Sequence, residues 1–138
     1  MKVRHAHALT MLEEARAGYP LEVCGVLLGK GPFVHAVVPV PNREVESPRV
    51  RYQIAPEDLA RIQREGREEG LDIVGYYHSH PDHPSRPSDT DRAFAAEGLS
   101  DGVVHVVVGI DAARRVTLTA WVFRDHAANF DREPFEIE

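Results

Sequence analysis

LDIVGYYHSHPDHPSRPSDTD, residues 71 to 91, is the stretch that decides how this chain is organised. Its beginning, residues 71–77, is mostly apolar with β-branched and aromatic side chains, which is typical of a buried strand. The strand leads directly into His78, Ser79 and His80. If the backbone stays extended there, His78 and His80 project to the same face, because side chains alternate along a strand. Two imidazoles on one face can bind a single metal ion.

The end of the stretch can bring a carboxylate to the same point. Ten residues lie between His80 and Asp91, which is enough for a loop to turn back toward the histidines. Ser88 and Asp91 also have the spacing of a helix N-cap and its capping-box acid, and a cap would fix where Asp91 points. Two histidines and one aspartate leave zinc an open fourth position, which is typical of a catalytic site. The alternative is an ordinary solvated loop.

The rest of the chain alternates between helical and strand patterns. Helices are expected at 5–17, from 55 to 70 and at 89–97, and strands at 23–28, 33–40, 71–77, 103–110 and 116–124. Helices interleaved with strands predict one α/β domain over residues 1–138, built around a mixed sheet. The polar segment 41–52 contains two prolines and is predicted to be a mobile loop.

Composition restricts the setting of the protein. The chain has 138 residues, 43% of them hydrophobic and 28% charged, as in ordinary globular domains. Neither a signal peptide nor an apolar stretch long enough to cross a membrane is apparent, so we expect a cytoplasmic protein without a membrane partner. A single cysteine, Cys24, fits a reducing compartment. The net charge of −6, with basic residues spread along the chain, argues against a nucleic-acid partner.

A hydrolytic zinc site also needs a base, and Glu22 is the candidate because it stands just before the apolar run 23–28. Its alternative interpretation is an exposed glutamate. Cys24 could be a thiol nucleophile, but its apolar strand favours a small buried residue. His83 could be a spare ligand, although a solvated loop residue is favoured, and His105 is expected to be a hydrogen-bonded strand residue.

Glu22 in LEVCGVLLG, followed by HSHP and then PSDTD, resembles the JAMM (MPN+/Mov34) zinc metallopeptidase family in its compact prokaryotic form. The family pattern is a glutamate ahead of a strand, then His-x-His-Pro, then Ser-x-x-Asp at a fixed gap. The resemblance implies an MPN/JAMM-like fold with a curved mixed β-sheet flanked by helices. It also implies one Zn²⁺ per chain and assigns a role to each motif residue: metal ligands His78, His80 and Asp91, general base Glu22, and oxyanion-stabilising hydroxyl Ser88.

Members of that family hydrolyse an amide bond at the C-terminal tail of ubiquitin or a ubiquitin-like protein. This chain is too short for long ubiquitin-binding insertions, so the implied substrate is a small β-grasp ubiquitin-like or sulfur-carrier protein, or its conjugates. Cleavage after the Gly-Gly tail would release cysteine or a lysine-linked partner. The alternatives are a catalytically silent MPN scaffold, and a zinc amidohydrolase acting on another peptide or small amide. The sequence leaves a homodimer open.

Overall fold

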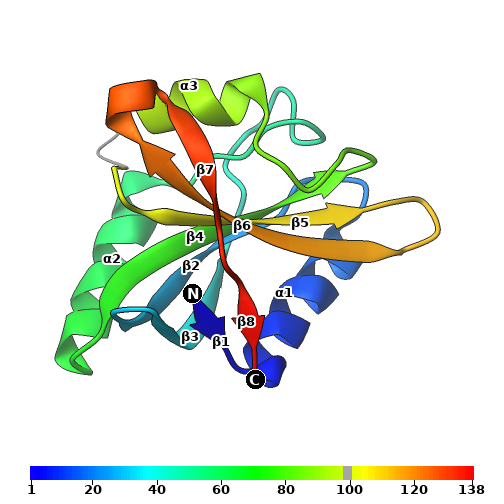
Figure 1. Cartoon of the computed structure of the whole chain (residues 1–138). Helices are drawn as coiled ribbons and strands as arrows, with labels where there is room; N and C mark the ends of the chain where they lie inside the picture. Colours follow the sequence, from blue (N-terminus) through cyan, green and yellow to red (C-terminus); the bar gives the residue numbers. More distant parts are fainter. Residues whose placement is uncertain (98–100) are drawn as a thin grey trace.

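The structure, a computed structural model, describes residues 1–97 and 101–138. Its helices are α1 (His5–Gly18), α2 (Pro56–Glu68), α3 (Asp89–Glu97) and the short 3₁₀ helix η1 (Asp125–Ala127). Its strands are β1 (Lys2–Val3), β2 (Cys24–Lys30), β3 (Phe33–Val40), β4 (Asp72–Pro81), β5 (Val104–Ile110), β6 (Val116–Arg124), β7 (Asn129–Glu133) and β8 (Glu136–Ile137). Within these residues the strands form one twisted sheet in the order β7-β6-β5-β4-β2-β3-β1-β8 (Figure 1).

The strand β4 lies inside this sheet and carries the two histidines of the motif. It pairs antiparallel with β2, with Cys24 opposite His78, and parallel with β5, with Gly109 opposite His80. The strand predicted to end at residue 77 therefore continues to Pro81. The extension follows from pairing with β5, whose Ile110 lies opposite Pro81, and such non-local partners are invisible in a local sequence pattern.

The two faces of the sheet are covered by different helices. On one face, Tyr77 packs in a core cluster with Met11 of α1, and on the other the β2 residue Val26 packs in a second cluster with Ile62 of α2. Figure 1 shows α1 and α2 on different sides of the sheet. Because His78 and His80 alternate with Tyr77 along β4, they lie on the face opposite α1.

Several predicted elements match the observed bounds. The strands at 33–40 and 116–124 and the helix at 89–97 have the predicted limits, and the other predicted helices agree within a few residues. The mixed sheet confirms the predicted α/β class. The sequence pattern predicts no element for β1, β7, β8 or η1, all of which are short. β7 and β8 are the edge strands of the sheet, and β1 lies next to β8.

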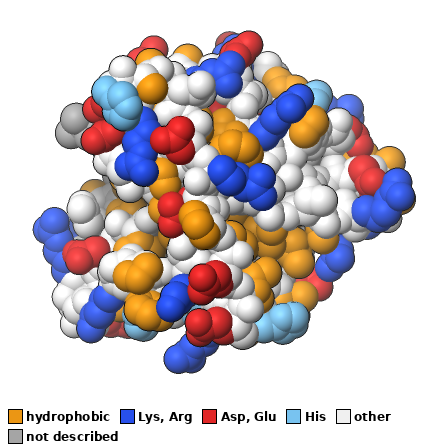
Figure 2. Space-filling view, viewed as in Figure 1, with side chains coloured by type: hydrophobic (Ala, Val, Ile, Leu, Met, Phe, Trp, Pro, Cys, Tyr) orange, Lys and Arg blue, Asp and Glu red, His pale blue; other side chains and the backbone are white. Residues whose placement is uncertain are grey.

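The helices and the charged side chains bear on what the protein can contact. None of the helices in residues 1–97 and 101–138 is long and apolar enough to cross a membrane. In the space-filling view, Lys and Arg side chains lie among Asp and Glu side chains on the face that is drawn (Figure 2). This arrangement agrees with the spread of basic residues along the sequence.

The segment 41–52 forms neither a helix nor a strand. Asn42 nevertheless organises it, because its amide nitrogen donates to the Arg51 carbonyl at 3.0 Å and to the Glu22 carbonyl at 3.1 Å. The Asn42 side-chain oxygen accepts hydrogen bonds from the backbone N–H groups of Glu44 and Gln53. The segment is therefore tied to Glu22, two residues before β2, and its mobility stays a prediction.

Candidate metal centre

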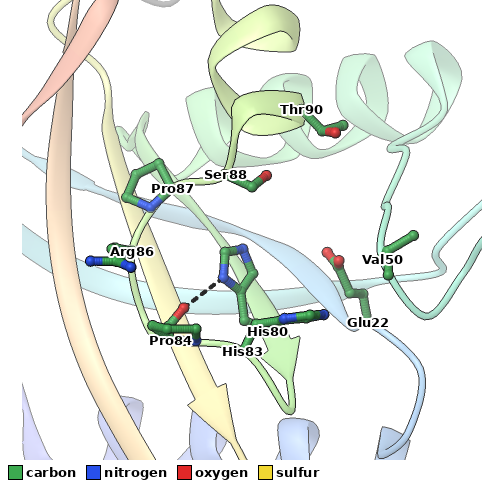
Figure 3. A pocket seen from close by; sticks show the side chains of 9 residues that line it. All are labelled: Glu22, Val50, His80, His83, Pro84, Arg86, Pro87, Ser88 and Thr90. Carbon is green, nitrogen blue, oxygen red and sulfur yellow. Dashed lines mark hydrogen bonds between the residues drawn. The ribbon is translucent and has the colours of Figure 1, made fainter.

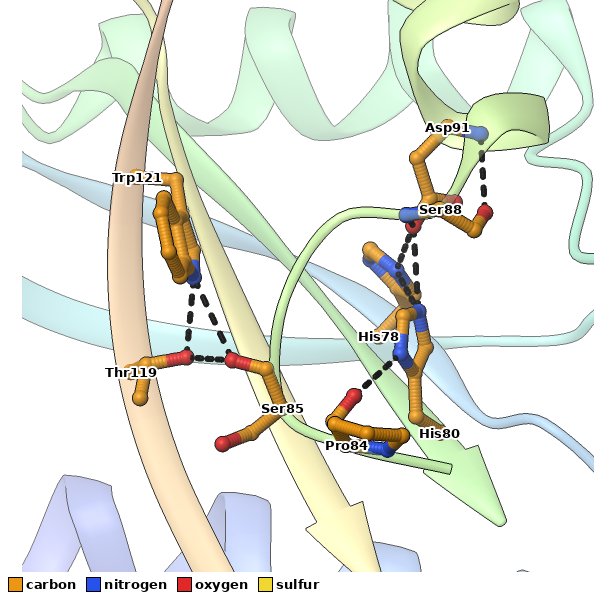
Figure 4. A network of polar contacts seen from close by, with 8 residues as sticks. All are labelled: His78, His80, Pro84, Ser85, Ser88, Asp91, Thr119 and Trp121. Carbon is orange, nitrogen blue, oxygen red and sulfur yellow. Dashed lines mark hydrogen bonds and ion pairs between the residues drawn. The ribbon is translucent and has the colours of Figure 1, made fainter. Parts of the chain in front are cut away.

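The end of β4 and the start of α3 bring three potential metal ligands together. The Nε2 atoms of His78 and His80 lie 3.0 Å apart, and Oδ2 of Asp91 lies 3.2 Å from the first and 3.0 Å from the second (Figure 4). Tetrahedral zinc with bonds of about 2.0–2.1 Å would place its ligand atoms about 3.3 Å apart. The three atoms therefore form a triangle of the size that a zinc ion requires, and the predicted grouping of these residues is what the structure contains.

Asp91 is held in place by the first turn of α3. The Ser88 backbone N–H donates to Asp91 Oδ2 at 2.9 Å, and the Asp91 backbone N–H donates to Ser88 Oγ at 3.1 Å. These reciprocal bonds are a capping box with aspartate in place of the usual glutamate. The predicted cap is confirmed, and the same bonds direct the Asp91 carboxylate toward the histidines.

The two histidines have different surroundings. His80 Nδ1 lies 2.8 Å from the Pro84 carbonyl, so it carries the proton and leaves the lone pair of Nε2 for a metal. The ring of His78 stacks on Tyr52, with centroids 4.5 Å apart and an angle of 20° between the planes. Tyr52 was not predicted to contribute, since a tyrosine in the segment 41–52 gives no signal of where its ring will lie.

The charges of the cluster suit a cation. Burial lowers the pKa of His78 and so favours the neutral imidazole that metals bind. Burial would lower the pKa of His80 as well, but the hydrogen bond and charge of Asp91 raise it. Burial opposes ionisation of Asp91, yet the two histidines and the Ser88 N–H hold its pKa well below the usual range. The carboxylate is therefore ionised, and it supplies the negative charge of the site.

Glu22 is buried beside this cluster. Only 5% of its surface is exposed, so the alternative interpretation of an exposed glutamate is wrong. Its backbone N–H donates to the Pro48 carbonyl at 2.7 Å, whereas Oε1 of its side chain is buried with no hydrogen-bond partner in the described part of the chain. Burial, with a smaller contribution from the charge of Asp91, raises the pKa of Glu22 to about 8.

A pocket of about 270 Å³ opens at this point. Glu22, His80 and Ser88 all line it, and in Figure 3 their side chains surround a common space. Exposed residues, among them Val50 and Arg86, complete its rim. The pocket thus gives a substrate access to a metal held at His80, to the buried carboxylate of Glu22 and to the hydroxyl of Ser88.

The other candidates have structural roles. Cys24 is fully buried, and burial raises the pKa of its thiol to about 12, so it is a poor nucleophile. His83 is exposed at the rim of the pocket and lies outside the triangle of ligand atoms.

His105 is a buried strand residue, as predicted, and pairs with Tyr76 of β4 and Trp121 of β6. Its Nε2 has no partner among residues 1–97 and 101–138. The ring instead packs edge-on against Phe130, with centroids 5.2 Å apart, and against Tyr76 at 5.8 Å.

Residues 4–124 match the Prok-JAB model, which is described as prokaryotic homologs of the JAB domain. The chain therefore belongs to this family of JAB/MPN domains. A JAB1/MPN domain protein from Archaeoglobus fulgidus has the same fold, with a TM-score of 0.64 at 19% identity over 99% of this chain and 98% of that one. The resemblance noted in the sequence and the predicted MPN/JAMM-like fold are confirmed.

Two relatives are similar in sequence as well. A desampylase from Haloferax volcanii is 39% identical over 81% of this chain and 81% of its own length. A protein from Thermus thermophilus, described as a probable TtuB-protein conjugate cleaving protease, is 34% identical over 78% of this chain and 72% of its own length.

Proposed function

We propose that this protein is a zinc-dependent peptidase or isopeptidase that cleaves an amide bond at the C-terminal Gly-Gly tail of a ubiquitin-like or sulfur-carrier protein. The observation that carries the proposal is the triangle of two imidazole nitrogens and one carboxylate oxygen beside the buried carboxylate of Glu22. The relatives from Haloferax and Thermus, a desampylase and a probable TtuB-protein conjugate cleaving protease, support the same reaction class.

His78, His80 and Asp91 would hold one zinc ion per chain. Imidazole and carboxylate are ligands that zinc accepts, and three protein ligands leave a position for water or substrate. Zinc bound there would act as a Lewis acid toward the scissile carbonyl and would make a water molecule more acidic. A catalytically silent scaffold would not need this ligand set together with a buried carboxylate whose Oε1 has no hydrogen-bond partner among the described residues.

Glu22 supplies proton transfer. Its carboxylate lines the pocket and its Oε1 has no hydrogen bond to protein groups within the described residues, so it is available to accept a proton from water. Zinc bound at the neighbouring ligands would favour the carboxylate form of Glu22. The burial that raises the pKa of Glu22 keeps this carboxylate basic enough to take a proton and to return it to the departing amine. Glu22 therefore acts first as a general base and then as a general acid.

Ser88 supplies a hydrogen-bond donor. Its Oγ accepts the Asp91 backbone N–H, which leaves the hydroxyl proton free to donate into the pocket. A donor there would stabilise the negative charge that develops on the carbonyl oxygen. The same serine thus serves as helix cap and as catalytic donor.

The substrate would be a small β-grasp carrier protein or its conjugate. An extended Gly-Gly tail suits a confined pocket, because glycine brings backbone close to the reacting groups without a side chain. The leaving group would be cysteine or a lysine-linked partner. The buried, unpaired Cys24 suits work in the reducing cytoplasm. Association of the enzyme into a homodimer stays a prediction.

The test uses the zinc-loaded protein with a carrier–cysteine adduct and a carrier–lysine conjugate, and product masses are followed with and without a chelator. We expect release of the leaving group, loss of release with chelator, and a loss of at least ~10²-fold for Glu22→Gln with zinc retained. Replacing the last glycine of the tail should abolish release. Failure with both substrates, by a protein that still cleaves other amides, would leave a zinc amidohydrolase and refute the carrier assignment.

A further inference from the structure

The segment that joins β4 to α3 is fastened to β6 by a chain of hydrogen bonds. The Trp121 Nε1–H donates to Thr119 Oγ1 at 2.9 Å, and the Thr119 hydroxyl donates to the Ser85 carbonyl (Figure 4). Trp121 also reaches the Ser85 carbonyl at 3.4 Å. In this series of hydrogen bonds, the indole N–H orients and polarises the Thr119 hydroxyl, and the hydroxyl does the same to the Ser85 carbonyl. The Ser85 carbonyl therefore has a defined position over the sheet.

The sheet is shaped to receive Ser85. Gly109 of β5 lies beneath it, and a Cβ atom at residue 109 would lie 3.2 Å from Ser85 Cβ and 3.3 Å from the Ser85 backbone nitrogen. The same Cβ atom would lie 2.7 Å from Thr117 Oγ1. A side chain at this position would push the connecting segment away from the sheet. The close contact between Ser85 and Gly109 requires glycine at position 109. It supports, independently of the hydrogen bonds, that Ser85 is held against the sheet.

The peptide group next to this contact orients a metal ligand. The Pro84 carbonyl accepts the proton of His80 Nδ1 at 2.8 Å, and it belongs to the peptide bond that joins Pro84 to Ser85. A shift of Ser85 would therefore move the acceptor of His80. The Nδ1–H bond fixes the orientation of the His80 ring, so that Nε2 is the atom that faces Asp91.

We propose that Thr119 and Trp121 are positioning residues for the metal centre. By holding Ser85 against β5 and β6, they keep the Pro84 carbonyl where it accepts the Nδ1–H of His80 and fixes the orientation of the ring. The proposal rests on the proposed function for the identity of the metal, but the hydrogen bond from His80 Nδ1 to the Pro84 carbonyl is a property of the metal-free protein. Neither residue carries a sequence signal for this role, because both lie in an ordinary strand pattern.

The test compares Thr119→Val, which keeps the shape of the side chain but lacks the hydroxyl, with Thr119→Ser, which keeps the hydroxyl. Thr117→Val is the matched control, since residue 117 lies two positions earlier on β6 and makes no side-chain hydrogen bond to the 82–88 segment in the described structure. The Nδ1–H proton of His80 is followed in the metal-free protein by ¹H–¹⁵N NMR, because a proton held in a hydrogen bond to the Pro84 carbonyl exchanges slowly with water. The zinc dissociation constant is measured by competition with a chromophoric chelator.

We expect Thr119→Val to speed the exchange of the His80 Nδ1–H proton and to weaken zinc binding by roughly 10-fold or more, the usual cost of losing an outer partner of a metal ligand. Thr119→Ser and Thr117→Val should match the parent protein in both measurements. Trp121→Phe, which keeps an aromatic ring, should change both measurements in the same direction but by less. It provides the test if Thr119→Val does not fold.

Unchanged exchange of the Nδ1–H proton and an unchanged zinc affinity in folded Thr119→Val and Trp121→Phe would overturn the proposal and leave these residues a purely structural role. If the parent protein binds no zinc, the proposed function fails. The exchange of the Nδ1–H proton then still decides whether β6 positions His80.

Discussion

Ser88 and Asp91 bind each other through two hydrogen bonds, and the Asp91 oxygen that accepts the Ser88 N–H also lies 3.0 Å from His80 Nε2. One carboxylate oxygen thus belongs to a helix cap and to the candidate metal centre. The start of α3 therefore cannot shift without moving a ligand, which couples local helix geometry to metal binding.

Asp91→Asn separates the two roles of this side chain. An amide oxygen can still accept the Ser88 N–H, so α3 should form and the thermal unfolding temperature should change little. The amide lacks the negative charge that a cation requires, and we expect zinc affinity to fall by more than the roughly 100-fold that loss of an outer partner costs. Metal analysis and chelator competition measure this. Asp89→Asn, in the same turn with a side chain 93% exposed, should bind zinc normally.

Ser88→Ala should have two separable effects. Loss of the N-cap should lower the free energy of unfolding by about 1 kcal/mol. Loss of the hydroxyl donor should lower kcat by roughly 10²–10³-fold, as for other oxyanion donors. Denaturant unfolding measures the first effect and steady-state kinetics the second. Ser88→Thr should restore most of both. A protein that is destabilised but still turns over normally would restrict Ser88 to capping.

Glu22→Gln should stabilise the metal-free protein in a pH-dependent way. Burial raises the pKa of Glu22 from 4.5 to about 8, so between these values the unfolded chain loses a proton that the folded chain keeps. The stability contributed by the protonated group is present below pH 4.5 and is lost as the pH rises through 8. We expect Glu22→Gln to raise the unfolding temperature at pH 8 and not at pH 4.5. Added zinc should reduce the difference at pH 8, because a nearby cation favours the carboxylate. Equal effects at both pH values would contradict the burial argument.

His105 should contribute to acid unfolding. Burial, with the nearby charge of His78, lowers the pKa of His105 from 6.5 to about 4, so the unfolded chain takes up a proton before the folded chain does. Its contribution is complete above pH 6.5 and is lost as the pH falls toward 4, by about 3 kcal/mol. His105→Phe should flatten this part of the stability profile, measured by denaturant unfolding at several pH values. His126→Gln, an exposed histidine in η1, should leave the profile unchanged.

The sequence predicts most of the metal centre because its parts are local. His78 and His80 follow from strand alternation, and Ser88 and Asp91 follow from cap spacing. Glu22 was identified by its position before an apolar strand, but its burial depends on Pro48 and Asn42, which contact its backbone from a distant segment. Burial of that kind cannot be read from neighbouring residues, which is why an exposed glutamate remained an alternative.

The parts that could not be predicted depend on contacts between distant segments. Tyr52 reaches His78 from a segment without regular structure, and Thr119 reaches Ser85 from another strand. The strand β7 was missed because Phe130 is the only apolar residue in NFDRE, so its alternation pattern is absent. The strand forms because β6 offers a free edge, with Phe123 opposite Phe130.

The pairing of Cys24 with His78 has a consequence for how this chain can evolve. A slip of one residue between β2 and β4 would turn both histidines to the opposite face of the sheet and carry Glu22 away from them. Single-residue insertions or deletions inside either strand should therefore be purged by selection. Homologues of this protein are therefore expected to keep the register that sets Cys24 opposite His78, even where other side chains differ.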